Sequence, residues 1–347
     1  MSIAVADDRI QLKHGSGGRA MRRLIEQLFL RAFETDPPMR AGVVGVAAMD
    51  DGGAVRVHDG WLVLTTDSHV VQPAFFPGGD IGRLAVCGTV NDLAMMGATE
   101  VLGLTCSVIL EDGYPRESLE RILASMREAC LQAHAAVIAG DTKVMRKGDI
   151  DGIVVNTSGI GLTPHLVRDA GLRPGDRLIV TGTIGDHGMA VMATRHGLDV
   201  HGDLRSDVAP LNGLIRAALT AAPNAVVAMK DPTRGGVAAA LHEMAGKSAV
   251  GIVIEEAALP VTDAVRGVSE LIGVDPLFVA NEGKAILGVQ PDAVSCVLNA
   301  LRAHQLGASA AVIGRCTEER AGTVILDTGV GLRLVAEPEG ELLPRIC

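Results

Sequence analysis

A short apolar segment that runs directly into an aspartate sets the strongest limit on how this chain can fold. Residues 61–66 are all apolar or β-branched and are followed at once by Asp67. A run of this length is typical of a buried strand, which here would deliver a carboxylate at its end. Residues 136–140 repeat the arrangement as a second strand that ends at Asp141. Because helical patterns alternate with strand patterns in both halves of the chain, the sequence predicts two α/β or α+β domains.

A boundary between these domains is expected where proline and glycine cluster, from residue 163 to residue 175. We therefore predict an N-terminal domain over residues 1–165 and a C-terminal domain over residues 166–335. In the second domain, apolar patterning predicts helices over 186–196, 209–222, 235–245 and 292–304, and strands over 251–255, 285–289, 310–315, 323–326 and 332–335. Residues 336–347 are largely polar and predict a mobile tail, which would span at most about 40 Å when fully extended.

The composition narrows the possible partners and the cellular compartment. The chain carries a net charge of −10 over 347 residues, so no basic field exists to attract nucleic acid or an anionic membrane. No apolar stretch is long enough to span a bilayer, and the N-terminus lacks the pattern of a signal peptide. The six cysteines form no C-x-x-C pair and fit neither a zinc site nor a disulfide framework. We therefore expect a cytoplasmic protein whose thiols stay reduced.

The last residue, Cys347, is an unusual place for a structural thiol. A chain end is commonly mobile, so a thiol there can be loaded with a group at one site and carry it to another. A frayed end that happens to stop at cysteine is the alternative interpretation.

Several carboxylates and one amide stand at the ends of predicted strands or beside glycines. They are Asp50, Asp51, Asp67, Asn91, Asp92, Asp141 and Asp231. Mg²⁺ prefers hard oxygen ligands, binds few protein carboxylates, and completes its shell with water and phosphate oxygens. Each residue alone is explained as well by a turn or a helix cap, and it is the set that predicts a site for Mg²⁺ and phosphate.

Two glycine-rich loops are candidates for binding an anion. Gly15, Gly17 and Gly18 form the loop HGSGG before an apolar helix, where backbone amides can approach a phosphate closely. The loop lacks the lysine of a P-loop and the spacing of a dinucleotide fold, so a plain turn is the alternative. Arg234 lies in a second loop, DPTRGG at 231–236, which also precedes a helix.

Two further short motifs place a single charged residue beside a glycine or an aspartate. Thr142 and Lys143 follow Asp141 directly, so Lys143 is a candidate for a site residue, with a solvated loop lysine as the alternative. Glu282 lies in NEGK at 281–284, between two apolar strands, and a hairpin turn would explain that motif without any function.

Together these motifs resemble the hydrogenase maturation family HypE, within the superfamily of aminoimidazole ribonucleotide synthetase and selenophosphate synthetase. The resemblance spans nearly the whole chain and rests on HGSGG at 14–18, the block at 65–98, AGDTKV at 139–144, DPTRGG, NEGK and the terminal PRIC. It implies a two-domain aminoimidazole ribonucleotide synthetase-like fold, ATP bound in a cleft, and a homodimer formed through the N-terminal domains.

The resemblance also implies a reaction and its partners. The carbamoyltransferase HypF would load a carboxamide on Cys347, and ATP would drive its dehydration to an S-cyanide. The cyano group would then pass to iron on a HypC–HypD scaffold complex, for the active site of a [NiFe]-hydrogenase.

The resemblance assigns roles to the candidate residues. Metal and phosphate handling would fall to Asp51, Asp67, Asp92 and Asp231. ATP binding would involve Gly15, Gly17, Gly18, Asp67, Asn91, Asp92, Asp141, Thr142 and Arg234. Besides Cys347, Glu282 would be the base that removes protons from the amide nitrogen, and Lys143 would stabilise developing charge, with the proton-moving role open between those two.

Two rival interpretations remain at this stage. The first is another ATP enzyme of the same superfamily, although selenophosphate synthetases usually carry cysteine or selenocysteine in the N-terminal glycine-rich loop, which HGSGG lacks. The second is a nucleotide-binding protein whose tail docks into partners, with Cys347 as a redox handle. Removal of Cys347 alone would separate these interpretations, because a rival enzyme would keep its activity on small substrates.

Overall fold

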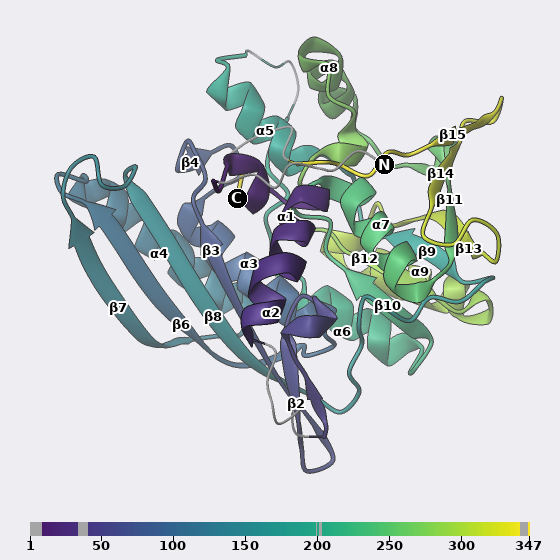
Figure 1. Cartoon of the computed structure of the whole chain (residues 1–347). Coiled ribbons are helices and arrows are strands. Elements are labelled where there is room, and N and C mark those ends of the chain that lie inside the picture. Colours follow the sequence, from purple (N-terminus) through teal and green to yellow (C-terminus); the bar gives the residue numbers. More distant parts are fainter. Residues whose placement is uncertain (1–8, 34–40, 199, 201–202, 341–345) are drawn as a thin grey trace.

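The computed structural model describes residues 9–33, 41–198, 200, 203–340 and 346–347. Two separate β-sheets organise the chain, and Figure 1 shows them as two lobes with helices packed on each. The strands of the first sheet lie within residues 43–163 and those of the second within residues 177–334. The mixture of helices and sheets confirms the predicted α/β class, whereas the exact division at residues 165 and 335 stays a prediction.

The first sheet has the strand order β1-β2-β3-β8-β6-β7. Its strands are β1 (Val43–Val44), β2 (Gly53–Val57), β3 (Gly60–His69), β6 (Glu100–Glu111), β7 (Val137–Met145) and β8 (Ile153–Thr163). All neighbours are antiparallel except β6 and β7, which are parallel. A small ribbon of β4 (Phe75–Phe76) and β5 (Gly79–Asp80) stands apart. Strand β7 comes last in the strand order and so forms one edge of the sheet.

One face of this sheet is covered by α3 (Ile81–Met95) and α4 (Arg116–Ala133). Helix α3 begins where Asp80 accepts hydrogen bonds from the backbone N–H groups of Gly82 and Arg83, as a helix N-cap does. Burial alternates along β3, where Val63 is fully buried and Leu64 is 55% exposed. Strand β3 is therefore buried on one face only, which corrects the expectation of a fully buried strand.

The second sheet has the strand order β10-β12-β9-β13-β11-β14-β15. Its strands are β9 (Arg177–Val180), β10 (Val226–Lys230), β11 (Gly251–Glu255), β12 (Ile286–Val289), β13 (Ala311–Thr317), β14 (Val324–Asp327) and β15 (Leu332–Leu334). The accompanying helices are α5 (Asp186–Arg195), α6 (Asn212–Ala221), α7 (Gly236–Ser248), α8 (Asp263–Ile272) and α9 (Val294–Ala303). Apolar side chains from both faces of this sheet form two further cores.

An N-terminal helical segment lies across the front of the two lobes in Figure 1. It consists of α1 (Gly18–Leu24), a π-helical turn (Ile25–Phe29) and α2 (Leu30–Phe33). The C-terminus lies beside the start of this segment in the same view, close to β4 and α5. The last two residues therefore lie near the first described helical segment of the chain.

Asn91 on α3 links the two halves of the chain. Its side-chain amide donates hydrogen bonds to the backbone oxygens of Ala209 and Glu282, each 3.1 Å away. Its Oδ1 accepts a hydrogen bond of 2.8 Å from the backbone N–H of Leu211. Because both polar atoms are used within the protein, the geometry favours a structural role for Asn91 over the expected contact with a nucleotide.

Candidate active site

Asp67 projects from the helix-covered face of β3, next to a buried histidine. The Nε2 atom of His69 lies 3.1 Å from Asp67 Oδ2, and the backbone N–H of Ser68 donates to Asp67 Oδ1. Burial tends to raise the pKa of Asp67, but the charge and hydrogen bond of His69 outweigh it and lower the pKa to about 2. A Cβ at Gly88 on α3 would lie 2.8 Å from His69 Nε2, so this pair needs glycine opposite it. Asp67 is therefore held as an anion.

Asp92, near the end of α3, faces the same space. Thr65 donates a hydrogen bond of 2.8 Å to Asp92 Oδ2 and also lies 3.0 Å from the backbone oxygen of Asp51. Burial raises the pKa of Asp92 well above its usual range, and the carboxylate of Asp231 raises it further. Like charges thus converge here without enough positive charge to balance them.

Asp231 and Glu282 come from the C-terminal domain and complete this group. Burial raises the pKa of Asp231 to about 8, and the nearby carboxylate of Asp51 adds to the effect. Burial also raises the pKa of Glu282 well above its usual range, helped by Asp231 and Asp67. Glu282 is 3% exposed, and its Oε1 atom is buried without a hydrogen-bond partner. We call Asp51, Asp67, Asp92, Asp231 and Glu282 the acidic site.

Lys230 forms ion pairs with Asp51 of the acidic site and with two further carboxylates. At the end of β10 its Nζ atom lies 2.6 Å from Asp51 Oδ1, 3.2 Å from Glu243 Oε2 and 3.6 Å from Asp169 Oδ2. Burial tends to lower the pKa of Lys230, but these three carboxylates raise it well above its usual range. A buried cation with three anionic partners fixes the orientation of Asp51, and removing it would leave uncompensated buried charge.

Arg234 brings positive charge to the acidic site and to the end of the chain. Burial tends to lower the pKa of Arg234, but Cys347 and then Asp67 and Glu282 raise it. Its guanidinium also donates a hydrogen bond of 3.1 Å to the backbone oxygen of Gly15. The structure therefore places the last residue of the chain within electrostatic reach of the same arginine as the carboxylates.

The tail is anchored to the first turn of α1 through its backbone. The N–H groups of Arg19 and Ala20 donate to the carbonyl oxygens of Pro338 and Glu339 at 2.9 and 3.0 Å. These N–H groups have no partner within a helix, so the tail satisfies them. A Cβ at Gly18 would overlap the carbonyl oxygen of Pro338. Gly18 therefore serves close packing of the tail.

Side chains reinforce this attachment. Glu337 pairs with Arg19 at 3.3 Å and also with Arg22, while Glu339 lies 3.2 Å from Arg19 and 3.5 Å from Arg23. We call these five residues the tail clasp. Residues 341–345 of the expected mobile tail lie outside the described residues.

The double change Glu337→Gln/Glu339→Gln is expected to loosen the tail. Each partly exposed ion pair contributes about 0.2–1 kcal/mol, so the four pairs together should hold the docked state at least about 4-fold more strongly. Alkylation of Cys347 by iodoacetamide, followed by peptide mass spectrometry, should speed up by that factor. Glu319→Gln, on an exposed loop, is the control, and an unchanged rate in the double variant would show that the clasp does not restrain the tail.

Gly15 and Gly17 of the N-terminal loop contact Arg234. Gly17 has a positive φ of 79°, and a Cβ there would lie 2.9 Å from the Cβ of Arg234. The loop thus lies against the DPTRGG loop, and its glycines allow that approach. Whether its backbone also contacts phosphate stays a prediction.

Asp141, Thr142 and Lys143 lie away from the acidic site, on the edge strand β7, and all three are exposed. Strands β8 and β6 lie between β3 and β7. Strand β7 is therefore three strand spacings from β3, which is about 14 Å. Cross-strand pairing aligns Asp141 with Ser107 and Lys143 with Ile109, so both project from the face opposite to Asp67. Within one protomer the structure therefore does not bring Lys143 together with Glu282.

The acidic site suits a cation with oxygen ligands. Among the described residues, no three histidine, cysteine or acidic side chains are already gathered tightly enough to hold a metal ion. Mg²⁺ does not require such a cage, because it binds through one or two carboxylates plus phosphate oxygens and water. The raised pKa of Asp92 and Asp231 and the unpartnered Glu282 oxygen show an excess of buried acidic groups that a cation would relieve.

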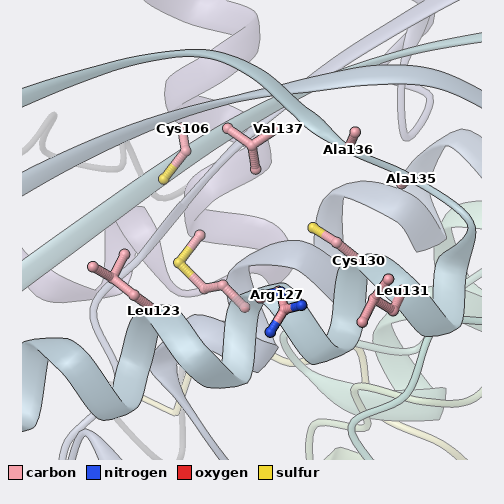
Figure 2. A pocket seen from close by; sticks show the side chains of 9 residues that line it. Cys106, Leu123, Arg127, Cys130, Leu131, Ala135, Ala136 and Val137 are labelled. Carbon is pink, nitrogen blue, oxygen red and sulfur yellow. The ribbon is translucent and has the colours of Figure 1, made fainter.

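A separate apolar cavity of about 360 Å³ lies between α4 and strands β6 and β7. Figure 2 shows Cys106 and Val137 on the strand side, and Leu123 and Cys130 on the helix. Burial raises the pKa of both cysteines, so their thiols stay protonated. Cys130 therefore packs as a small hydrophobic residue, and none of the candidate site residues lines the cavity.

Comparison with known proteins places this geometry in a family. Residues 49–163 match the N-terminal domain, and residues 173–327 the C-terminal domain, of the AIR synthase related proteins. The carbamoyl dehydratase HypE of Rhizobium leguminosarum bv. viciae is 47% identical over 348 residues, which cover 99% of this chain and 97% of that one. The chain belongs to the HypE family. The HypE of Escherichia coli K12 is 45% identical, over 98% of this chain and all of its own length.

Solved HypE structures have the same fold. A HypE in complex with ATP is 40% identical and superposes with a TM-score of 0.80 over 98% of this chain and 100% of its own. A HypE–HypF complex contains a chain that is 44% identical, with a TM-score of 0.83 over 91% of this chain and 99% of that one. A thiamine monophosphate kinase, 19% identical with a TM-score of 0.70, shares the fold alone. The aminoimidazole ribonucleotide synthetase-like fold that the sequence predicted is thus confirmed.

Three residues near the site were not predicted from the sequence: Lys230, His69 and His187. Lys230 ends an apolar strand and directly precedes Asp231. Other candidate site residues also stand at strand ends, so Lys230 could have been identified as a site residue from the sequence. His69 follows two residues after Asp67, on the same face of the strand, and could have been found by strand alternation. His187 lies on α5, and its Nε2 is 2.9 Å from the carbonyl oxygen of Ile346. It belongs to none of the motifs, so no local pattern in the sequence marks it.

Proposed function

We propose that this protein dehydrates an S-carboxamide on its own Cys347 to an S-cyanide with ATP, supplying the cyanide ligand of iron for [NiFe]-hydrogenase maturation. One observation carries the proposal: Cys347 and the acidic residues Asp67, Glu282 and Asp92 all lie within electrostatic reach of Arg234 and raise its pKa. Family membership supports it, since several relatives are carbamoyl dehydratases and one HypE binds ATP. The overall change converts the carboxamide and ATP to thiocyanate, ADP, phosphate and a proton.

ATP is needed because an amide oxygen leaves poorly. Transfer of the γ-phosphoryl group to the carboxamide oxygen turns that oxygen into a phosphate leaving group. The carbon–oxygen bond then breaks, phosphate departs, and the carbon–nitrogen bond becomes triple as two protons leave the nitrogen. The protein must therefore hold the tail still, accept protons and balance the charge of the phosphates.

Glu282 is the proposed proton acceptor. Its carboxyl is buried, and its Oε1 atom has no hydrogen-bond partner among the described residues, so this oxygen is available to accept a proton from the substrate. Its raised pKa reflects burial and the surrounding carboxylates, so neutralising Asp231 and Asp67 would bring the pKa back toward the range in which Glu282 is a base. Arg234 offsets negative charge that develops beside Cys347.

We propose that Asp67, Asp92 and Asp231, with Asp51 behind them, hold Mg²⁺ together with the ATP phosphates. When bound, Mg²⁺ would neutralise phosphate charge and support phosphoryl transfer. Lys230 keeps Asp51 oriented for this role, and Thr65 does the same for Asp92.

Binding of Mg²⁺ and a non-hydrolysable ATP analogue is expected to strengthen as the pH rises from 6 to 8. Asp231 has a pKa of about 8 in the metal-free protein, so below that pH the cation must displace its proton. Affinity should increase by up to about tenfold per pH unit for each proton displaced and level off above pH 8. Titration calorimetry at several pH values measures this, and affinity that falls as the pH rises would contradict the assignment.

We further propose a homodimer formed through the open face of the first sheet. Leu64, Leu102 and Leu162 are 55%, 48% and 38% exposed on β3, β6 and β8, and Ile138 on the edge strand is 65% exposed. A contiguous apolar sheet face of this kind is typical of an interface. Lys143 lies on the same open face, so we propose that it acts toward the acidic site of the partner subunit.

Leu64→Asp/Leu162→Asp is expected to convert the dimer to monomers. Each leucine buried at an interface contributes about 1.5–3 kcal/mol, and placing charge there adds an electrostatic cost. Light scattering at micromolar concentration should report half the wild-type mass. Leu271→Asp, at a 73% exposed leucine on α8, is the control and should stay dimeric. A monomeric wild-type protein would refute the interface.

The proposed partners follow from the same reaction. A solved complex joins a HypE to HypF, which supports HypF as the carbamoyl donor for this chain. We propose HypC–HypD as the acceptor of the cyano group, and the cytoplasm as the compartment. Among the helices that the structure describes, none combines the length and the apolar composition needed to cross a bilayer.

Phosphate release on the carbamoyl-loaded chain tests the proposed reaction. Adding ATP should give a burst of about one phosphate per loaded chain, because each chain carries one reacting thiol. The unloaded chain should give no burst. Equal phosphate release from loaded and unloaded chains would instead favour a kinase of the same fold.

A further inference from the structure

The penultimate residue of the tail is held by a buried histidine on α5. His187 Nε2 lies 2.9 Å from the carbonyl oxygen of Ile346, and the ring is fully buried. Ile346 is only 2% exposed and packs in the same apolar cluster as Phe76. The Phe76 ring stands edge-on to His187, with the ring centroids 5.3 Å apart. Ile346 therefore lies in an apolar pocket, which we call the seat of the tail, and its carbonyl oxygen is held there by His187.

The hydrogen bonds around His187 determine which nitrogen carries the proton. A carbonyl oxygen only accepts, so Nε2 must donate to Ile346. Nδ1 lies 2.8 Å from the hydroxyl of Ser206, which itself accepts from the backbone N–H of Val208 at 3.1 Å. Burial lowers the pKa of His187, so the ring is neutral and Nδ1 accepts the Ser206 proton. The ring is thus fixed in the tautomer that holds the tail.

The same loop that fixes His187 also fixes the proposed base. The residue after Ser206 is Asp207, whose Oδ1 accepts a hydrogen bond of 3.0 Å from the backbone N–H of Glu282. Asp207 also pairs with Lys284 at 3.3 Å. Two adjacent residues of one loop therefore connect the seat of the tail to the backbone of Glu282.

We propose that His187 is a positioning residue, which through Ser206 and Asp207 fixes the end of the tail relative to Glu282 so that the Cys347 carboxamide meets its base. This inference rests on the dehydration proposed above. It assigns His187 no chemistry on the carboxamide itself, since its contact is the carbonyl of Ile346. It predicts a residue that matters for dehydration and not for loading, because loading by a separate enzyme requires the tail to leave this seat.

Two isosteric replacements test the inference. In His187→Gln the terminal amide nitrogen takes about the position of Nε2 and can still donate to Ile346. In His187→Asn the amide reaches only the position of Nδ1, so the contact with Ser206 is kept and the contact with the tail is lost. Single-turnover dehydration of the loaded protein should be about 10–100-fold slower for His187→Asn, since small misplacements of reacting groups have effects of this size. It should be only about 3–10-fold slower for His187→Gln, which loses the contact with Ser206 but keeps the contact with the tail.

Binding of ATP is the internal control and should be unchanged in both variants, and loading of Cys347 should go to completion in both, because it requires the tail to leave this position. Alkylation of Cys347 in the unloaded protein should be about 3–10-fold faster in His187→Asn than in His187→Gln, the range expected for one hydrogen bond. Equal rates of dehydration and alkylation in the two variants would overturn the inference. If wild-type protein does not dehydrate at all, the proposed function fails, and the alkylation rates still test the seat.

Ser206→Ala keeps the assay informative if His187→Asn does not fold. This variant leaves the ring in place but removes the donor that fixes its tautomer, so dehydration should slow by about 3–10-fold while loading stays normal. Dehydration at the wild-type rate in a folded Ser206→Ala protein would contradict the linkage through the loop.

Discussion

Replacing Glu282 with glutamine is expected to slow dehydration of the loaded protein by about 100–10,000-fold, the usual contribution of a positioned general base. Glutamine has the same shape but cannot accept a proton. Burial raises the pKa of Glu282 well above its usual range and so disfavours its charged form, and an uncharged glutamine of the same shape should therefore preserve the fold. Loading of Cys347 and binding of ATP should stay at wild-type levels. Single-turnover mass spectrometry of the loaded chain gives the rate.

Glu255→Gln is the matched control for this experiment. Glu255 is an exposed residue of the same domain, paired only loosely with Arg315 at 3.5 Å, and its replacement should change nothing. A Glu282→Gln protein that dehydrates as fast as wild type would assign the proton transfer elsewhere, with the partner subunit's Lys143 as the remaining candidate.

Replacing Asp231 with asparagine is expected to abolish Mg²⁺-dependent binding of ATP and to lower the dehydration rate by about 100–1,000-fold, the scale of losing one electrostatic stabiliser. With a pKa of about 8, Asp231 is mostly protonated at pH 7 in the metal-free protein. Asparagine therefore resembles the resting state of the side chain, and it removes a carboxyl that repels Asp51. The loss should appear only when the cation binds.

Thermal unfolding separates this effect from damage to the fold. Without Mg²⁺, the Asp231→Asn protein should melt at or above the wild-type temperature, most clearly above pH 8, where the wild-type carboxylate is ionised. Adding Mg²⁺ and ATP should stabilise the wild-type protein and leave the variant unchanged. Equal stabilisation of both proteins would remove Asp231 from the metal site.

Elements with strong local signals were predictable from sequence. Helix 235–245 and strand 251–255 are found as α7 and β11, because each begins at a glycine and carries a run of apolar residues. Helix α8 (Asp263–Ile272) was not predicted, although apolar residues recur along it at helical spacing and Thr262 caps it. The signal for this helix was therefore present in the sequence.

The convergence of the acidic site was predictable in part. Asp67 and Asp92 belong to one sequence block, but their approach to Asp231 and Glu282 depends on how two domains pack, which no local pattern encodes. Lys143 shows the opposite problem. The sequence motif around Lys143 predicts a site residue, yet strand β7 lies at the far edge of the sheet. No contact among the described residues of a single chain therefore explains why Lys143 stands there.

The seat of the tail was beyond the reach of sequence. A polar segment with proline and glycine predicts mobility, and Glu337 and Glu339 look like solvated charges. Their partners, Arg19, Arg22 and Arg23, lie more than 300 residues away in the sequence, on a helix whose start is completed by the backbone of the tail. Only the folded chain shows that Cys347 has a defined position.

Intact mass of the protein, taken during incubation with HypF, carbamoyl phosphate, ATP and Mg²⁺, tests the central claim most directly. The account predicts that the chain first gains one carboxamide and then loses one water, that the second step requires ATP and Mg²⁺, and that Cys347→Ala gains nothing. A wild-type chain that gains no carboxamide from an active HypF, or that keeps the carboxamide intact with ATP and Mg²⁺ present, would contradict it.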